Sequence, residues 1–256
     1  MRHATLILIL LLTGCAISEE KEIAMGRDAA PTFEREFGGL YPDPAVQDYV
    51  HEVGMDLAQD TNRAHLPWQF RVLDSDEVNA FALPGGFVYL TKGLLFNLEN
   101  EAQLASVLGH EIAHVAHRHS VQQLQRAQFV QGGSLLVGIF AGGVAGDVSN
   151  LAASLALMRY GRGQEREADL SGLNYVVRDG YEPHAMVETM EILERASGGK
   201  RGGLDFLSTH PSPGNRREYL AERIDKRYET VVSGGATNED RFESIVLRRR
   251  DAIGRR

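Results

Sequence analysis

The segment His110-Glu111-Ile112-Ala113-His114 places two histidines four residues apart, with a glutamate directly after the first. Positions four apart share one face of a helix, so both imidazoles can reach a single metal ion. Glu111 lies about 100° further round the helix, where it can reach a water at the metal without being a ligand. This arrangement is typical of zinc hydrolases. It supplies only two protein ligands, whereas a catalytic zinc usually has three.

The third ligand must come from another part of the chain. The longer motif that adds a glycine and a third histidine is missing, because His117 and Ser120 stand at those positions. Glu165 and Asp169 are four residues apart in a second helical pattern. If the two helices pack together, Glu165 can complete the site and Asp169 can accept the other ring N–H of a histidine ligand. The alternative is a solvated acidic face, which we expect for Glu167.

Two helices are expected to hold these residues. Asn100 begins a long amphipathic helix, and Gln103 follows at capping-box spacing. The helical pattern continues to about Phe129. A second helix is expected at 164–178 and is closed by Asp179-Gly180.

The residues before the motif indicate further helices and a small sheet. The pattern at 19–60 is helical, with a turn at 41–44. Strands are expected near 68–73, 79–83 and 86–90, which predicts a sheet of three or four strands beside the motif helix. We expect strand 86–90 to form an edge that binds an extended substrate. The fold class is therefore α+β and mainly helical.

The residues after the second helix indicate two more helices, one at 183–195 and one from Pro213 onward. The remainder, 231–256, is expected to form a loosely ordered tail, which leaves 41–230 as the main domain. The apolar, glycine-rich segment 132–146 is too short to span a bilayer. It is either a packed, partly mobile helix, which we favour, or a segment that dips into a membrane surface.

The N-terminus is typical of a secretion signal. Residues 1–14 contain a short positive region and a continuous apolar run, too short for a membrane span. Leu12-Thr13-Gly14-Cys15 resembles a bacterial lipobox, which predicts a lipid on Cys15 and an anchored segment at 15–40. The alternative is an ordinary cleaved signal with an incidental cysteine. Ala16 at the following position favours the outer membrane.

The composition is that of a globular protein. The 256 residues are 43% hydrophobic and 24% charged, enough for one good core. The net charge of −8 argues against nucleic acid as a partner, since such proteins usually carry a basic excess.

The two motifs, together with Asn79-Ala80-Phe81-Ala82 and Pro84-Gly85-Gly86, resemble the M48 family of zinc metallopeptidases. The resemblance covers roughly 45–223 and is greatest for the compact periplasmic lipoproteins, the branch of BepA and LoiP. It implies a zincin-type domain with one zinc ion per chain and Glu111 as catalytic base. The zinc ligands that it implies are His110, His114 and Glu165.

A second family feature is the segment 208–216, which is similar to the family's His-Pro segment with a following arginine. The resemblance implies that His210 is either a fourth metal ligand that holds the enzyme shut or a group that faces the reacting carbonyl. Arg216 is then a candidate partner for the oxyanion. The alternative is that His210 only caps a turn. His117 and His119 are expected to be solvated or to lie outside the ligand set.

These observations predict a zinc endopeptidase. The resemblance adds misfolded or misassembled envelope proteins as substrates, the outer-membrane assembly machinery as a possible partner, and a location on the periplasmic side of the outer membrane, anchored through Cys15. One alternative is a latent zinc-bound chaperone or assembly factor whose site is plugged by His210. Another is a purely structural zinc site, which the open coordination of two histidines and one glutamate disfavours.

Overall fold

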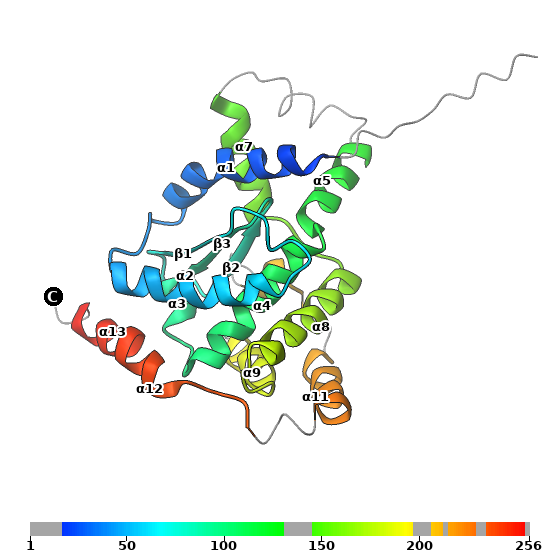
Figure 1. Ribbon diagram of the computed structural model, residues 1–256. Helices are drawn as coiled ribbons and strands as arrows, with labels where there is room; N and C mark the ends of the chain where they lie inside the picture. Colours follow the sequence, from blue (N-terminus) through cyan, green and yellow to red (C-terminus); the bar gives the residue numbers. More distant parts are fainter. Residues whose placement is uncertain (1–16, 131–144, 197–205, 212–214, 229–233, 254–256) are drawn as a thin grey trace, which may run out of the picture.

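The computed structural model describes residues 17–130, 145–196, 206–211, 215–228 and 234–253 (Figure 1). The predicted signal, Cys15 and most of the apolar segment after residue 131 lie outside the described residues.

A small mixed sheet lies between layers of helices. The elements before the motif helix are α1 (Glu19–Glu36), α2 (Pro44–Gln59), β1 (Gln69–Leu73), β2 (Ala80–Leu83), β3 (Phe87–Thr91) and α3 (Lys92–Leu95). The strand order is β1-β3-β2, with β3 parallel to β1 and antiparallel to β2. The prediction that strand 86–90 forms an edge is therefore wrong. Its backbone groups are paired on both sides, and the edges of this sheet are β1 and β2.

The motif helix is followed by a series of further helices. In chain order these elements are α4 (Glu101–Ala116), α5 (His119–Val130), α7 (Ala145–Ala156), α8 (Arg162–Arg178), α9 (Ala185–Ala196), α10 (Phe206–Thr209), α11 (Arg216–Arg227), α12 (Glu239–Phe242), the π-helix η1 (Glu243–Leu247) and α13 (Arg248–Ile253). The mainly helical α+β fold predicted from the sequence is confirmed.

The two faces of the sheet are covered by different helices. Alternate residues of a strand point to opposite faces. Val88 and Leu90 of β3 join a core with α2, α4 and α8, whereas Phe87 and Tyr89 join a second core with α1 and α7. Figure 1 shows α1 and α7 on one side of the sheet and α2 and α4 on the other. Every residue of α4 is buried, so the motif helix lies at the centre of the fold.

The start of α4 follows the predicted cap, but its end does not follow the prediction. The Asn100 side chain accepts the backbone N–H of Gln103 at 3.0 Å. The helix ends at Ala116 instead of continuing to about Phe129, and α5 begins three residues later. Arg118 between them has φ +58°, a left-handed conformation that a regular helix excludes.

The C-terminal residues differ most from the prediction of a loosely ordered tail. They form α12, η1 and α13, and both Phe242 and Val246 are fully buried in the main core. Asn238 donates to Glu101 at 2.7 Å, and Arg241 lies 3.1 Å from the other oxygen of that carboxylate. The tail therefore packs against the beginning of the motif helix. Among the described helices, none has the length and apolar character needed to cross a membrane.

Candidate metal centre

Helices α4 and α8 approach each other closely at two glycines, one on each helix. A Cβ atom on Gly172 would lie 2.9 Å from the backbone carbon of Gly109 and from the amide nitrogen of His110. Only hydrogen fits at such a distance, so the two backbones are in contact here. This contact sets the histidine face of α4 against the acidic face of α8, as expected from the two i, i+4 motifs.

Four side chains converge at this contact, and their nearest atoms have the spacing of a zinc ligand set. The Nε2 atoms of His110 and His114 are 3.1 Å apart and lie 3.6 and 3.5 Å from the Glu165 carboxylate oxygens. Nδ1 of His210 is 3.3 Å from the His110 nitrogen and 3.1 Å from Glu165 Oε1. Ligands about 2.0–2.1 Å from a tetrahedral zinc are separated by about 3.3–3.4 Å. The observed separations fall on both sides of that value.

The buried polar atoms of the cluster also fit a cation. All four ligand candidates are buried, and their donor atoms lie within 4.8 Å of one another. Neither carboxylate oxygen of the buried Glu111 has a hydrogen-bond partner among the described residues. A buried carboxylate without compensation is strongly unfavourable. A divalent cation among these donors would supply that compensation.

Asp169 lies behind His110, on the side away from the cluster. Its Oδ1 atom is 3.0 Å from His110 Nδ1, which leaves Nε2 directed at the other ligand candidates. Burial opposes ionisation of Asp169, but the Arg216 charge and the His110 contact hold its pKa well below the ordinary value. The carboxylate therefore stays charged and can fix the ring orientation of His110, the position predicted for it.

The sequence predicted that Arg216 would face a substrate oxyanion, but the structure places its side chain elsewhere. Its guanidinium donates to both oxygens of Asp169, at 2.8 and 2.5 Å, and lies 3.0 Å from Glu165 Oε2. The residue is only 2% exposed. Burial opposes its charge, but the two carboxylates raise the pKa of Arg216 above its ordinary value. It therefore holds the acidic face of α8 from behind the ligands.

His210 belongs to the cluster and does not simply cap a turn. It follows α10, and its ring stacks on Phe206 with the ring centres 4.3 Å apart. Nε2 of His210 is also 3.5 Å from Glu111 Oε1. Burial disfavours the imidazolium form, but the charges of Glu165 and Glu111 raise the pKa of His210.

Burial raises the pKa of the Glu111 carboxylate. A raised pKa makes Glu111 a better proton acceptor than an ordinary surface carboxylate.

Two aromatic rings lie next to His114: Tyr160, which was not identified from the sequence, and His119, which was expected to be solvated or to lie outside the ligand set. The Tyr160 ring stacks on His114 with a centroid distance of 3.9 Å, and its hydroxyl is 2.9 Å from Ser120 Oγ. His119 lies on the other side of the ligand, with its Nδ1 atom 2.9 Å from His114 Nδ1. Spacing could not reveal the second contact, because His119 is five residues from His114 and would point elsewhere on a continuous helix.

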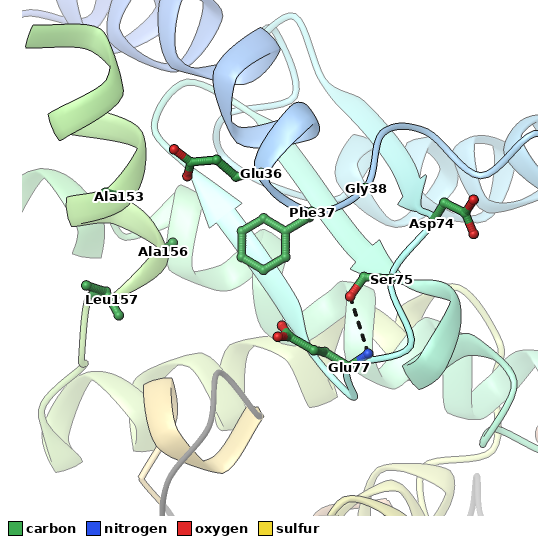
Figure 2. Close-up of a pocket in the computed structure, with 9 residues that line it drawn as sticks. All are labelled: Glu36, Phe37, Gly38, Asp74, Ser75, Glu77, Ala153, Ala156 and Leu157. Carbon is green, nitrogen blue, oxygen red and sulfur yellow. Dashed lines mark hydrogen bonds between the residues drawn. The ribbon is translucent and has the colours of Figure 1, made fainter. Parts of the chain in front are cut away.

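A separate pocket of about 350 Å³ shares no residue with this cluster (Figure 2). It lies between the end of α1, the loop after β1 and the end of α7. Figure 2 shows the Phe37 ring and Leu157 near the carboxylates of Glu36 and Glu77. It therefore provides no opening to the candidate metal centre, whose four residues are enclosed.

Comparisons with known proteins agree with this geometry. A family model described as Peptidase family M48 matches residues 44–224. The beta-barrel assembly-enhancing protease of Yersinia pestis is 33% identical over 223 residues, covering 83% of this chain and 46% of that protein. The corresponding Escherichia coli K12 protein is 32% identical over 233 residues, covering 86% and 47%.

The mitochondrial metalloendopeptidase OMA1 of Schizosaccharomyces pombe is 31% identical over 221 residues, covering 82% of this chain and 64% of that protein. This chain thus matches about half the length of the bacterial relatives. The family match spans the sheet, both motif helices and the segment with His210. The chain therefore belongs to peptidase family M48.

Proposed function

We propose that this protein is a zinc-dependent endopeptidase. The observation that carries the proposal is the enclosed set of His110, His114 and Glu165 donor atoms, 3.1–3.6 Å apart, with the unpartnered Glu111 carboxylate beside it. Family membership implies a metal, and two imidazoles with one carboxylate form a typical catalytic zinc set. When bound, zinc would polarise a peptide carbonyl and lower the pKa of a water at the site.

The residues of the chain would carry the proton transfers and hold the ligands. Glu111 accepts a proton from the attacking water and returns it to the leaving amine, a role suited to a buried carboxylate with a raised pKa. Asp169 fixes the ring of His110, and Arg216 pairs with Glu165 and Asp169 and holds their carboxylates in place. His210 lies close enough to Glu111 to contact a reacting group if its segment moves.

The setting of this activity is proposed from the relatives and the N-terminus. Several relatives are named for enhancing β-barrel assembly, which supports misfolded or misassembled envelope proteins as substrates and the outer-membrane assembly machinery as a partner. The lipobox-like segment supports removal of residues 1–14, an anchor at Cys15 and a position on the periplasmic side of the outer membrane. The family match supports a peptidase domain within 41–230.

The direct test is Glu111→Gln, which keeps the size of the side chain and removes the base. We expect the zinc-loaded variant to bind one zinc per chain, as the wild type does, and to lose at least about 100-fold in casein cleavage. The exposed Glu36→Gln is the control for a general effect of losing a carboxylate. Undiminished cleavage by Glu111→Gln would refute the assigned base.

A second candidate is a latent state in which His210 closes the site. Its ring is only 2% exposed and contacts the other ligand candidates, so the donor set has four members in this conformation. His210→Ala should then increase casein cleavage. An inert wild type together with an inert His210→Ala variant would favour a zinc-bound chaperone or assembly factor over a peptidase.

A further inference from the structure

The break between α4 and α5 brings a fourth histidine to the metal centre, in addition to His110, His114 and His210. On a continuous helix, His119 would lie about 140° round the axis from His114. Arg118 instead adopts φ +58°, held by its hydrogen bonds to Glu22 at 2.8 Å and to the backbone oxygen of Ile17 at 2.6 Å. The chain turns here, and the fully buried His119 ring comes to lie beside His114.

A line of hydrogen-bonding contacts then leads from His114 to α8. His119 Nδ1 is 2.9 Å from His114 Nδ1, and His119 Nε2 is 3.2 Å from Glu167 Oε2. The other Glu167 oxygen lies 3.3 Å from Nδ1 of His117, whose Nε2 is 2.8 Å from the hydroxyl of Ser171. Glu167 was expected to be a solvated residue, but it contacts two histidines while its side chain is 52% exposed.

One assignment of protons satisfies every contact in this line. His114 directs Nε2 toward the ligand cluster, so its proton lies on Nδ1 and must be donated. His119 can accept it only with an unprotonated Nδ1, which places its own proton on Nε2. A carboxylate is an acceptor only, so Glu167 fixes that tautomer by accepting from Nε2.

We propose that His119, held by Glu167, is a positioning residue that fixes the ring orientation and tautomer of the metal ligand His114. The inference rests on the proposed zinc centre. In this arrangement the two histidine ligands are oriented by different kinds of group. His110 is oriented by a buried carboxylate paired with Arg216, whereas His114 is oriented by a neutral imidazole whose own support is a half-exposed glutamate.

The test compares variants that keep or remove the acceptor beside His114. In His119→Asn, the amide oxygen can take the place of Nδ1, because both atoms are bonded to Cγ. His119→Leu fills the space without an acceptor, and Glu167→Ala removes the support of the imidazole. His65→Leu is the control, because it removes an imidazole from another carboxylate pair, 2.8 Å from Glu19, far along the chain from the centre.

The readout is the zinc dissociation constant, measured by chelator competition, together with urea unfolding of the metal-free proteins. We expect His119→Leu to bind zinc about 10–100-fold more weakly, the range for residues that orient a metal ligand. The asparagine variant should stay within about threefold of the wild type, and Glu167→Ala should fall between the two. The metal-free forms should unfold at similar urea concentrations, since the effect lies in metal binding.

Wild-type zinc affinity in His119→Leu would overturn the proposal, as would an equal loss in the asparagine and leucine variants. If His119→Leu does not fold, Glu167→Ala decides the question, because its half-exposed side chain can be removed without creating a cavity. Wild-type affinity in that variant would then overturn the proposal. A wild type that binds no zinc would instead refute the proposed function.

Discussion

Arg216 and Arg217 are adjacent on α11 but differ in their surroundings. Arg216 is buried against Asp169 and Glu165. Arg217 lies on the surface, 2.9 Å from Glu191, and both side chains of this pair are about half exposed. Replacement of each arginine by methionine keeps an apolar stem of similar length and removes only the guanidinium. The pair therefore separates the effect of a buried charge from that of a surface charge.

The expected costs differ by several kcal/mol. Removal of one partner from a buried ion pair costs about 3–5 kcal/mol, because the other charge stays buried without compensation. Arg216→Met leaves two such carboxylates, so its cost should lie in the upper part of that range. An exposed pair contributes about 0–1 kcal/mol, which bounds the effect of Arg217→Met. A double variant, Arg216→Met with Asp169→Leu, should recover part of the loss because fewer buried charges remain unpaired.

The assay is urea unfolding of the metal-free protein in the presence of a chelator. We expect Arg216→Met to lower the free energy of unfolding by about 4 kcal/mol and Arg217→Met by less than about 1 kcal/mol. Equal, small losses in both variants would refute the argument that Arg216 compensates the acidic face of α8. Failure of the double variant to recover any stability would contradict the charge mechanism specifically.

Three further predictions concern the framework of the site. Gly172→Ala should lower the free energy of unfolding by about 1–3 kcal/mol and weaken zinc binding, because its Cβ meets the backbone of α4. Gly163→Ala on the same helix is the control. A Cβ there has no atom within 4 Å, so this variant should not lose stability through a clash. Burial and three nearby carboxylates raise the pKa of Asp179 at the end of α8, so its charge destabilises the fold above that pKa. Asp179→Asn should therefore stabilise the protein by about 0.3–1 kcal/mol at neutral pH, and urea unfolding at about pH 3 should show no gain. Phe242→Ala should cost about 3–5 kcal/mol in the same assay, because the ring is fully buried.

Clear results would count against each of these. An unchanged stability and zinc affinity in Gly172→Ala would contradict the close contact of the two helices. A gain in Asp179→Asn that persists at low pH would mean that the charge is not its cause. A wild-type free energy of unfolding in Phe242→Ala would contradict the packing of the C-terminal residues in the core. It would support the loosely ordered tail expected from the sequence.

The parts of the site that could be predicted are those set by helical spacing. His110 and His114 share a face because they are four apart, and the same holds for Glu165 and Asp169. The contact between the two faces is fixed by glycines, and it meets the condition under which Glu165 was expected to complete the site, that the two helices pack together.

The parts that could not be predicted depend on contacts between distant segments. Arg118 has no local preference for a left-handed conformation, and the break there depends on Glu22, 96 residues away. The position of His119 follows from that break. Arg216 was recognised by family pattern, but its orientation toward Asp169 depends on the packing of α11 on α8. Strand order likewise depends on long-range pairing, which a run of apolar residues around 86–90 does not determine.

The central claim is that His110, His114 and Glu165 form one zinc site. Its most direct test is anomalous diffraction at the zinc edge from crystals of the wild-type protein grown with zinc. We predict one strong peak per chain, about 2.0–2.2 Å from Nε2 of His110, Nε2 of His114 and a carboxylate oxygen of Glu165. A zinc-saturated crystal with no peak among these three residues would contradict the account.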